Sequence, residues 1–509
     1  MLTKIIVLSI YVAILFLIGW VASKRVNTMS DYYVGGKNLG FWAVAFSARA
    51  TGESGWLLIG LTGMGAMSGL SAYWVVVGEV LGVAVSWWLM AKRFKRKSDD
   101  YQSITVPDYL QSHFKSSTNT LRIIAASVLA IFVVIYVSAQ IDATGVAFES
   151  MLGGRHHVIG TLYTNITYHW GAIIGFLIVL VYIFIGGFVA VVWSDFFQGV
   201  LMFFGLILLP VVVWLQMDHG QGIIEGLNSI DPALTSIWGG HPDVWMNIFA
   251  MLGFAMIGLG FLGSPQVYVR FMSIKKESEI DKGKWVAVIF TLLTDAAAVT
   301  IGILARIFFT EQGDDPVGIL GVGGKEVLDM VTTNFLPDIL IAIYVAIVLS
   351  AIMSTIDSLL VLASSAITRD FYQKIFRPDL KDEDLTNISR VVTLVMALLA
   401  LGLAMLTAYL SPDRQIFWTM IFGWSGIAAT FCPVIILSLF WKAYTEKGAI
   451  ASMVAGFLCV PLFKFYFQNL EGVGAYFEKL DVLAPSFAVA MIVGVIVSKL
   501  SPSEPKASL

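Results

Sequence analysis

Long apolar stretches alternate with short polar connections along almost the whole chain. A helix needs about 20 apolar residues to cross the hydrocarbon core of a bilayer, and about 13 stretches reach or approach that length. They lie near residues 5–22, 41–64, 71–91, 122–150, 170–188, 191–215, 245–270, 285–309, 336–366, 388–409, 416–441, 446–466 and 482–499. The pattern predicts an all-α polytopic membrane protein with about 13 transmembrane helices.

The composition agrees with this class of protein. Of the 509 residues 58% are hydrophobic and 13% are charged, and the net charge is -3. A water-soluble fold would have too few polar residues to cover its surface, and no large basic face is available for nucleic-acid phosphates. We therefore expect the lipid bilayer and a small-molecule solute as partners, and no nucleic acid.

The positions of the cations predict the orientation of the helices. Lys and Arg stay on the cytoplasmic side, and most of the 32 in this chain fall there if the N-terminus lies outside. The stretch 216–244, which would then be external, contains neither residue. An odd number of helices places the C-terminus in the cytoplasm, so we expect a multi-pass protein of the cell inner membrane.

Several classes of protein lack support in the sequence. No GxxxxGK[ST] loop indicates ATP-driven pumping, and no catalytic triad, metal cluster or organic cofactor loop indicates an enzyme. Residues 1–509 are expected to form a single transmembrane transporter domain. Transport driven by an ion gradient remains, and a channel or a sensor that binds solute without turnover is the alternative.

Glycine and small polar residues cluster in three of the predicted spans, at 47–69, 253–265 and 350–365. Discontinuous helices have this composition, and in inverted-repeat transporters they form the binding site at the middle of the membrane. Tight packing of helices through small residues is the simpler explanation. The second and seventh predicted spans occupy matching places five helices apart, which favours broken helices in these two.

Several segments resemble the sodium:solute symporter family and, within it, the sodium/proline symporter branch. The resemblance covers nearly the whole chain and is carried by Ser54–Gly60, Phe184–Phe188, Trp193–Asp195, Pro265, Arg270–Met272, Ala351–Thr355, Ser364–Thr368, Trp424–Gly426 and Pro433. It implies a five-plus-five inverted repeat. The first repeat would span about 41–215 and the second about 245–441, with flanking helices at 5–22, 446–466 and 482–499.

The resemblance also implies a sodium site, with sodium as the coupling ion and the only metal. Sodium is a hard cation that prefers oxygen ligands, and unwound carbonyls with hydroxyls supply them without a full charge. The implied ligands are the carbonyls of Ala50, Glu53 and Ala351 and the hydroxyls of Ser354 and Thr355. The alternative is that these hydroxyls bond back to the preceding helical turn.

Further ionisable groups in the spans are expected to take part in coupling. The resemblance gives Asp195 a role in coupling or ion exit; the alternative is that it lies in water at the membrane edge. Asp357 and Ser358 match the position of a second sodium in some members of the family. Arg49 and Glu53 are four residues apart and would share a helix face. A second ion, a bridge from Arg49 to Asp357 and a protonatable carboxylate all stay open.

The solute is expected to be a small amino acid or related zwitterion, with proline as the leading candidate. The residues that the resemblance implies or that lie nearby are Ser54, Trp56, Tyr136, Gln140, Asp142, Ile257, Phe261 and Pro265. Ile257 and Phe261 stand where the proline branch has a tryptophan and a tyrosine, and Gly52 replaces its aspartate. Proton coupling, or a carboxylate, osmolyte or sugar as the solute, therefore stays open.

Overall fold

The computed structural model describes residues 2–26, 28–152, 155–159, 162–165, 167–216, 222–411 and 414–501. The α-helices are α1 (Leu2–Ser23), α2 (Met29–Val34), α3 (Phe41–Gly52), α4 (Thr62–Ser68), α5 (Tyr73–Val85), α6 (Ala91–Asp100), α7 (Val106–Phe114), α8 (Thr120–Leu152), α9 (Tyr168–Leu215), α10 (Ile223–Ile230), α11 (Val244–Met256), α12 (Pro265–Ser273), α13 (Ile280–Phe309), α14 (Pro316–Leu320), α15 (Val327–Phe335), α16 (Asp338–Ser365), α17 (Asp382–Leu410), α18 (Ile416–Phe440), α19 (Glu446–Phe465), α20 (Gly474–Leu480) and α21 (Leu483–Leu500). Short 3-10 segments are η1 (Gly35–Lys37), η3 (Gly69–Ala72), η5 (Pro232–Thr235), η6 (Ile257–Leu262), η7 (Glu277–Glu279), η8 (Val322–Gly324) and η10 (Phe467–Asn469), and wider π segments are η2 (Trp56–Leu61), η4 (Ser86–Met90) and η9 (Ala366–Phe376). Two antiparallel strands, β1 (Arg155–Ile159) and β2 (Leu162–Asn165), form a hairpin between α8 and α9.

Eleven helical segments of the described residues are long and apolar enough to cross a membrane. The predicted stretch 170–188 corresponds to the shorter apolar helix Tyr168–Phe184, and the stretch 41–64 is divided between α3 and α4. These two stretches account for the difference between the 11 segments and the about 13 predicted spans. The all-helical membrane fold is confirmed, and the hairpin is an addition that hydropathy misses because it lies between the apolar stretches.

The long helix α9 contains two of the predicted spans and changes direction between them. Gly187 has φ 55° and ψ −154°, a conformation that glycine alone adopts freely. A Cβ atom at this position would lie 2.6 Å from the ring of Tyr32. Both the turn and the close approach therefore require glycine at the junction of the two spans.

Two helices are interrupted at the centre of the bundle, as predicted for the second and seventh spans. α3 ends at Gly52, and Glu53 leaves the helical region with φ −97° and ψ 82°. In the other interrupted helix, α11 passes into η6, and Ser264 is extended just before α12 begins. The third predicted interruption, at 350–365, is wrong: α16 is continuous there, because Ser350, Ser364 and Ser365 bond back within the helix and the small residues serve packing.

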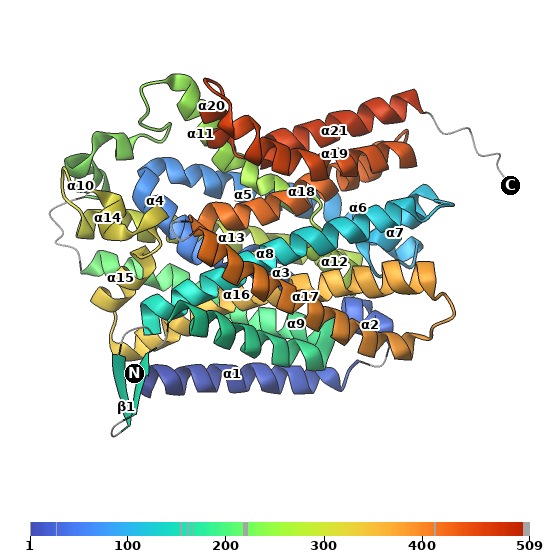
Figure 1. Ribbon diagram of the computed structural model, residues 1–509, viewed down its shortest axis with the longest axis horizontal. Coiled ribbons are helices and arrows are strands. Elements are labelled where there is room, and N and C mark those ends of the chain that lie inside the picture. The colour runs from blue at the N-terminus through green and yellow to red at the C-terminus, as the bar shows by residue number, and fades with distance from the viewer. Residues whose placement is uncertain are drawn as a thin grey trace.

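Most long helices run side by side in one direction, with α1 along one edge of the bundle and α19 and α21 along the opposite edge (Figure 1). In the most apolar window of α16, 83% of residues are buried, and in that of α18, 89%. The corresponding fraction for α1 is 22%. α16 and α18 are therefore central, and α1 presents most of its surface outward, as a lipid-facing helix does.

Candidate functional site

The interruption of α3 is held open by aromatic side chains. Trp56 Nε1 donates to the carbonyl of Gly52 at 2.9 Å, which satisfies a helix end that has lost its next turn. A Cβ atom on Gly52 would lie 2.7 Å from Cε1 of Phe261 in η6. Gly52 and Phe261, two of the three positions that depart from the proline pattern, are thus in contact, and the ring of Phe261 requires the glycine.

Two adjacent hydroxyls of α16 meet the last turn of α3. Ser354 Oγ donates to the carbonyl of Ala50 at 2.8 Å, and Thr355 Oγ1 donates to the carbonyl of Thr51 at 3.0 Å. Their contacts to the carbonyl of Ala351 in their own helix are longer, 3.1 and 3.4 Å. The hydroxyls therefore reach across to the neighbouring helix in preference to the preceding turn.

These contacts form a cluster of three carbonyl and two hydroxyl oxygens, all from buried residues. It contains four of the five implied sodium ligands: Ala50, Ala351, Ser354 and Thr355. Within the described residues the carbonyl of Glu53 accepts no hydrogen bond from these hydroxyls, and that of Thr51 accepts in its place. Sequence reasoning missed Thr51 because the register of the last turn of α3 decides which carbonyls face α16.

Asp195 of α9 is completely buried beside this cluster. Its Oδ2 accepts from Ser47 Oγ at 2.6 Å and from Arg270 Nη2 of α12 at 2.8 Å. Thr51 Oγ1 also approaches it, at 3.3 Å. Asp195 therefore does not lie in water at the membrane edge. Arg270, which the sequence analysis used only as part of a motif, is its counter-ion.

Asp357 and Ser358 belong to the same polar network. The hydroxyl of Tyr182 donates to Asp357 Oδ2 at 2.8 Å, and Ser358 Oγ lies 2.9 Å from Thr51 Oγ1. Arg270 Nη2 also donates to Ser358. The structure thus brings Asp195, Asp357 and Ser358 together, as the resemblance implies.

Ser54, Tyr136 and Gln140 form a buried polar group beside the interruption of α3. Gln140 Nε2 donates to Ser54 Oγ at 2.9 Å, and the Gly55 amide donates to Gln140 Oε1 at 3.1 Å. The Tyr136 hydroxyl lies 3.3 Å from Ser54 Oγ. Three of the expected solute residues therefore meet at the unwound backbone.

An aromatic wall adjoins this polar group, and Trp424 of α18 is its central member. Its ring lies 5.1 Å from that of Phe261 and 6.4 Å from that of Tyr136, and its Nε1 donates to the carbonyl of Ile257 at 3.2 Å. Trp424 belongs to one of the motifs in the sequence, and the motif gave it no role. A tryptophan beside small residues in an apolar span was the signal available.

The remaining expected solute residues lie around the two interruptions. Trp56 packs edge-on against Phe417, with ring centroids 6.2 Å apart. Pro265 is the first residue of α12, where its missing N–H costs nothing. The broken segments thus carry Trp56, Ile257, Phe261 and Pro265, while Tyr136 and Gln140 come from α8.

The expectation that Asp142 adds polar capacity to the solute group is corrected by the structure. Arg414, just before α18, binds both oxygens of its carboxylate, with Nε to Oδ2 at 2.6 Å, and the Tyr168 hydroxyl donates to Oδ1 at 2.8 Å. An arginine that binds both oxygens satisfies most of a carboxylate's capacity. Asp142 therefore links α8 to the start of α18.

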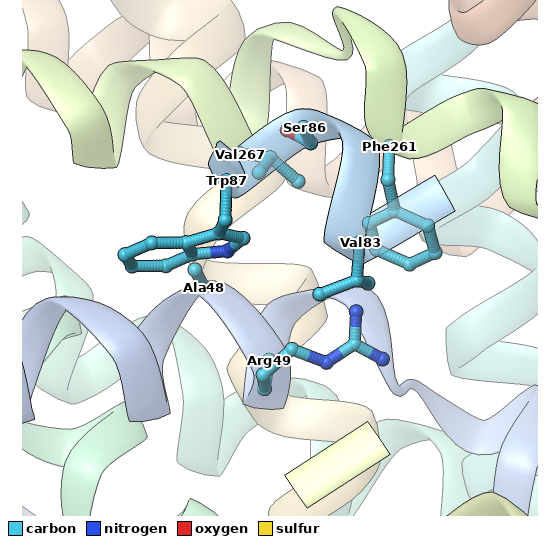
Figure 2. Close-up of a pocket in the computed structure, with 7 residues that line it drawn as sticks. All are labelled: Ala48, Arg49, Val83, Ser86, Trp87, Phe261 and Val267. Carbon is cyan, nitrogen blue, oxygen red and sulfur yellow. The ribbon is translucent and has the colours of Figure 1, made fainter. Parts of the chain in front are cut away.

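Arg49 shares a helix face with Glu53, as predicted, and bonds to it through Nε at 3.0 Å and through Nη2. The expected alternative, a bridge from Arg49 to Asp357, is wrong, because Arg49 pairs with Glu53 and Glu79 and Asp357 accepts from Tyr182. Figure 2 shows the guanidinium of Arg49 extended toward Val83 and Phe261. Its Cζ lies 4.5 Å from the centroid of the Phe261 ring, at the range of a cation–π contact.

A neutral side chain at position 53 is expected to reduce stability and to leave sodium activation nearly unchanged. Glu53→Gln keeps the shape of the side chain but removes the charge that faces Arg49, a loss of about 1.5–3 kcal/mol for a charged hydrogen bond. The measurement is the unfolding free energy of the purified protein together with the sodium dependence of uptake. Glu149→Gln, at an exposed position of α8, is the control. Loss of sodium activation in a folded Glu53→Gln protein would contradict the expectation.

Two membrane-spanning helices are interrupted at the bundle centre. Beside them lie a buried oxygen cluster and a polar and aromatic group. These features define a multi-pass membrane transporter. The model of the sodium:solute symporter family matches residues 32–456. The chain belongs to this family.

Curated relatives match the chain over nearly its whole length. It is 32% identical to the high-affinity proline transporter PutP of Bacillus subtilis, over 93% of this chain and 97% of that protein. It is 31% identical to the osmoregulated proline transporter OpuE of the same organism, over 99% and 96% of the two chains. A sodium/proline symporter of Staphylococcus aureus is 30% identical, over 97% and 92%.

Two solved structures share the fold. One is a Na+-coupled sialic acid symporter in a substrate-bound, outward-open state, with a TM-score of 0.76 at 18% identity, over 100% of this chain and 99% of that one. The other is Mhp1, a nucleobase-cation-symport-1 family transporter, with a TM-score of 0.52 at 13% identity, over 94% and 96%. These neighbours have inverted-repeat folds, and the expected fold is confirmed.

Proposed function

We propose that this protein couples the uptake of a small amino acid or related zwitterion, with proline as the leading candidate, to the entry of sodium. The observation that carries the proposal is the cluster of hydroxyls and carbonyls between the interrupted α3 and α16. Relatives that are named proline transporters and sodium/proline symporters support the choice of ion and solute.

Sodium would lie among the carbonyls of Ala50, Thr51 and Ala351 and the hydroxyls of Ser354 and Thr355. Neutral oxygens on two helices suit a monovalent hard cation that must be released again, because a carboxylate ligand would hold it more strongly. Each hydroxyl now donates to a carbonyl across the cluster. When the ion binds, a hydroxyl turns its hydrogen away and offers a lone pair, so the ion replaces two hydrogen bonds that link α3 to α16.

Asp195 would couple the ion cluster to the rest of the bundle, and Asp357 with Ser358 would contribute to a second cation position. Thr51 connects the two groups, since its carbonyl accepts from Thr355 and its hydroxyl faces Asp195 and Ser358. One arginine, Arg270, faces two carboxylates here. A second cation would balance the remaining charge.

The solute would bind between the polar group Ser54, Tyr136 and Gln140 and the aromatic wall of Phe261 and Trp424. The polar side would orient the charged end of a zwitterion, and the wall would cover its apolar part. With Ile257 and Phe261 in place of two donors, this wall offers fewer hydrogen bonds than the proline branch. The proposal therefore covers small amino acids as a class.

The chain is proposed to use the two repeats at about 41–215 and 245–441, with the N-terminus outside and the C-terminus in the cytoplasm. The external stretch without Lys or Arg supports this orientation. Inward transport of solute with sodium then follows the usual direction of the sodium gradient.

Accumulation of labelled proline in sealed vesicles tests the function. Purified protein in liposomes with an inward sodium gradient is expected to concentrate proline, and replacement of sodium by potassium is expected to abolish accumulation. Equilibration without accumulation would indicate a channel, and binding without entry would indicate a sensor. Either result would contradict symport.

Competition defines the solute class, because specificity depends on the few groups that touch the solute. Unlabelled proline and other small amino acids are expected to inhibit the uptake of labelled proline, whereas sugars and simple carboxylates are not. The measurement is initial uptake with each competitor in excess. Inhibition by a sugar or a carboxylate, with none by amino acids, would contradict the assignment and leave the symporter class intact.

A further inference from the structure

Four charged side chains meet between α3, α5 and α13, outside the sodium cluster and the solute group. They are Arg49, Glu53, Glu79 and Asp295, and each is at most 1% exposed. Arg49 bonds to Glu53, and its Nη2 lies 3.6 Å from Oε2 of Glu79. Three carboxyl groups thus face one guanidinium within the membrane. If all were ionised, the group would carry an excess of two negative charges.

Among the described residues, the donors near the four groups that form hydrogen bonds to a carboxylate serve Glu53, and Nη1 of Arg49 has no partner. Glu53 accepts from Arg49 and from the Thr294 hydroxyl at 2.9 Å. In the described part of the chain, neither carboxyl oxygen of Glu79 has a hydrogen-bond partner, and the same holds for Oδ2 of Asp295. Asp295 Oδ1 lies 3.3 Å from the Thr294 hydroxyl, whose single hydrogen has closer acceptors. Glu79 and Asp295 therefore lack donors of their own.

An ionised carboxylate without a donor is strongly disfavoured in a membrane interior, whereas a protonated carboxyl is neutral. If Glu79 and Asp295 each carry a proton, the ion pair of Arg49 and Glu53 is the only charged pair that remains in this group. Buried acids of this kind mark proton paths in membrane transporters.

A proton fits the geometry better than a metal ion or a cationic solute. Among the residues that the structure describes, no three His, Cys, Asp or Glu side chains converge to hold a metal ion. The packing gap beside Arg49 is too narrow for a water molecule, and Val83, Trp87 and Phe261 are among the side chains that line it (Figure 2). Neither Glu79 nor Asp295 lines it, and a proton needs no such space.

The groups that can influence Glu79 are few. Arg49 and Glu53 face it from α3, Asp295 faces it from α13, and the phenol of Tyr136 on α8 is within electrostatic range. The other segments that pack on α5, namely α11, η3, η4 and η6, contain no ionisable residue. Arg49 is therefore the one cation among these groups.

We propose that Glu79 and Asp295 bind protons and that Glu79 exchanges its proton during transport, which makes H+ a further coupling ion; this rests on the symport proposed above. In the present arrangement Arg49 bonds to Glu53, and Glu79 keeps its proton. When the unpaired Nη1 of Arg49 turns to Glu79 while Nε keeps its bond to Glu53, the proton leaves Glu79 to water on the side that is then open. The step breaks one O–H bond, and rebinding from the other side forms it again.

The contact between α5 and η6 connects this exchange to the solute site. A Cβ atom on Gly258 of η6 would lie 1.9 Å from the carbonyl oxygen of Gly78, and one on Gly82 would lie 2.1 Å from the carbonyl oxygen of Gly258. Glu79 follows Gly78 directly. A shift of η6 when solute binds therefore moves Glu79 relative to Arg49, which is anchored on α3.

Infrared spectroscopy of the purified full-length protein tests proton binding without any solute. The wild type at neutral pH is expected to show the C=O stretch of protonated carboxyl groups, and Glu79→Gln and Asp295→Asn are each expected to lose part of it. Glu471→Gln, at an exposed position, should leave this band unchanged. Absence of the band from the wild type, or its full retention in both variants, would overturn the inference.

Vesicles that enclose a pH-sensitive dye test proton exchange. Addition of sodium and proline is expected to acidify the interior of wild-type vesicles. In vesicles with Glu79→Gln this acidification should be lost, and any remaining proline uptake should no longer respond to a pH gradient. Wild-type uptake without acidification would overturn the exchange. Absence of proline uptake from the wild type would instead refute the proposed function, and the infrared result would still decide proton binding.

Discussion

Replacing Asp195 by alanine is expected to destabilise the protein by about 3–5 kcal/mol, the cost of leaving a buried charge without its partner. Arg270 would lose the carboxylate that lies 2.8 Å from its Nη2, in a place where neither residue has any exposed surface. The measurement is denaturant unfolding of the purified protein in detergent, followed by intrinsic fluorescence.

A double variant separates the pair from general damage to the bundle. Asp195→Ala with Arg270→Leu removes both charges, so it should be more stable than Asp195→Ala alone. Arg96→Ala is the control, since the pair of Arg96 and Glu277 lies at the surface and is screened by solvent. A double variant less stable than both single variants would show that the ion pair is not the source of the loss.

Removing either hydroxyl of the oxygen cluster is expected to weaken sodium activation. Ser354→Ala and Thr355→Ala each delete one ligand oxygen, and the sodium concentration for half-maximal uptake should rise about tenfold, or ~1.4 kcal/mol. Protein abundance should change far less, because each hydroxyl makes only neutral hydrogen bonds. The measurement is the initial rate of proline uptake against sodium concentration.

Ser364→Ala is the matched control on the same helix. Ser364 is buried, and its hydroxyl donates to the carbonyl of Val361 one turn back, so it lies outside the cluster. This variant should keep the sodium dependence of the wild type. Unchanged sodium dependence in both Ser354→Ala and Thr355→Ala would refute the ion site.

The charged groups around the interruption of α3 are arranged about one arginine. By the resemblance, Gly52 stands where the proline branch has an aspartate, and the ring of Phe261 occupies the space beside it. The acidic groups Glu53, Glu79 and Asp295 lie around Arg49. These carboxyl groups therefore face a cation of the protein itself.

The hydropathy of the sequence was sufficient to predict the membrane-spanning bundle. Each span responds to the bilayer through its own apolar length, so no knowledge of neighbouring helices is needed. The interruptions of the second and seventh spans were also predictable, because glycine and proline act on their own stretch of backbone. Four of the five implied sodium ligands came together because two short motifs carry them.

Partnerships between distant side chains depended on the tertiary structure. Arg49 bonds to Glu53 rather than to Asp357, and Asp142 is bound by Arg414, 272 residues further along the chain. A rotation of one helix by a single residue turns each side chain through about 100°. Sequence alone does not determine that rotation.

The residues that sequence analysis missed have the same physical origin. Arg270 and Trp424 stood within recognised motifs, and Thr51 stood between the implied ligands Ala50 and Glu53. Glu79 and Asp295 were visible as acidic residues inside apolar spans, but their partners were not visible in the sequence. The sequence alone determined the membrane class, the spans and the two interruptions, since these depend on local composition. Helix packing alone decided which oxygens surround an ion and which carboxyl groups lack a counter-ion. Both depend on the distances between side chains of different helices.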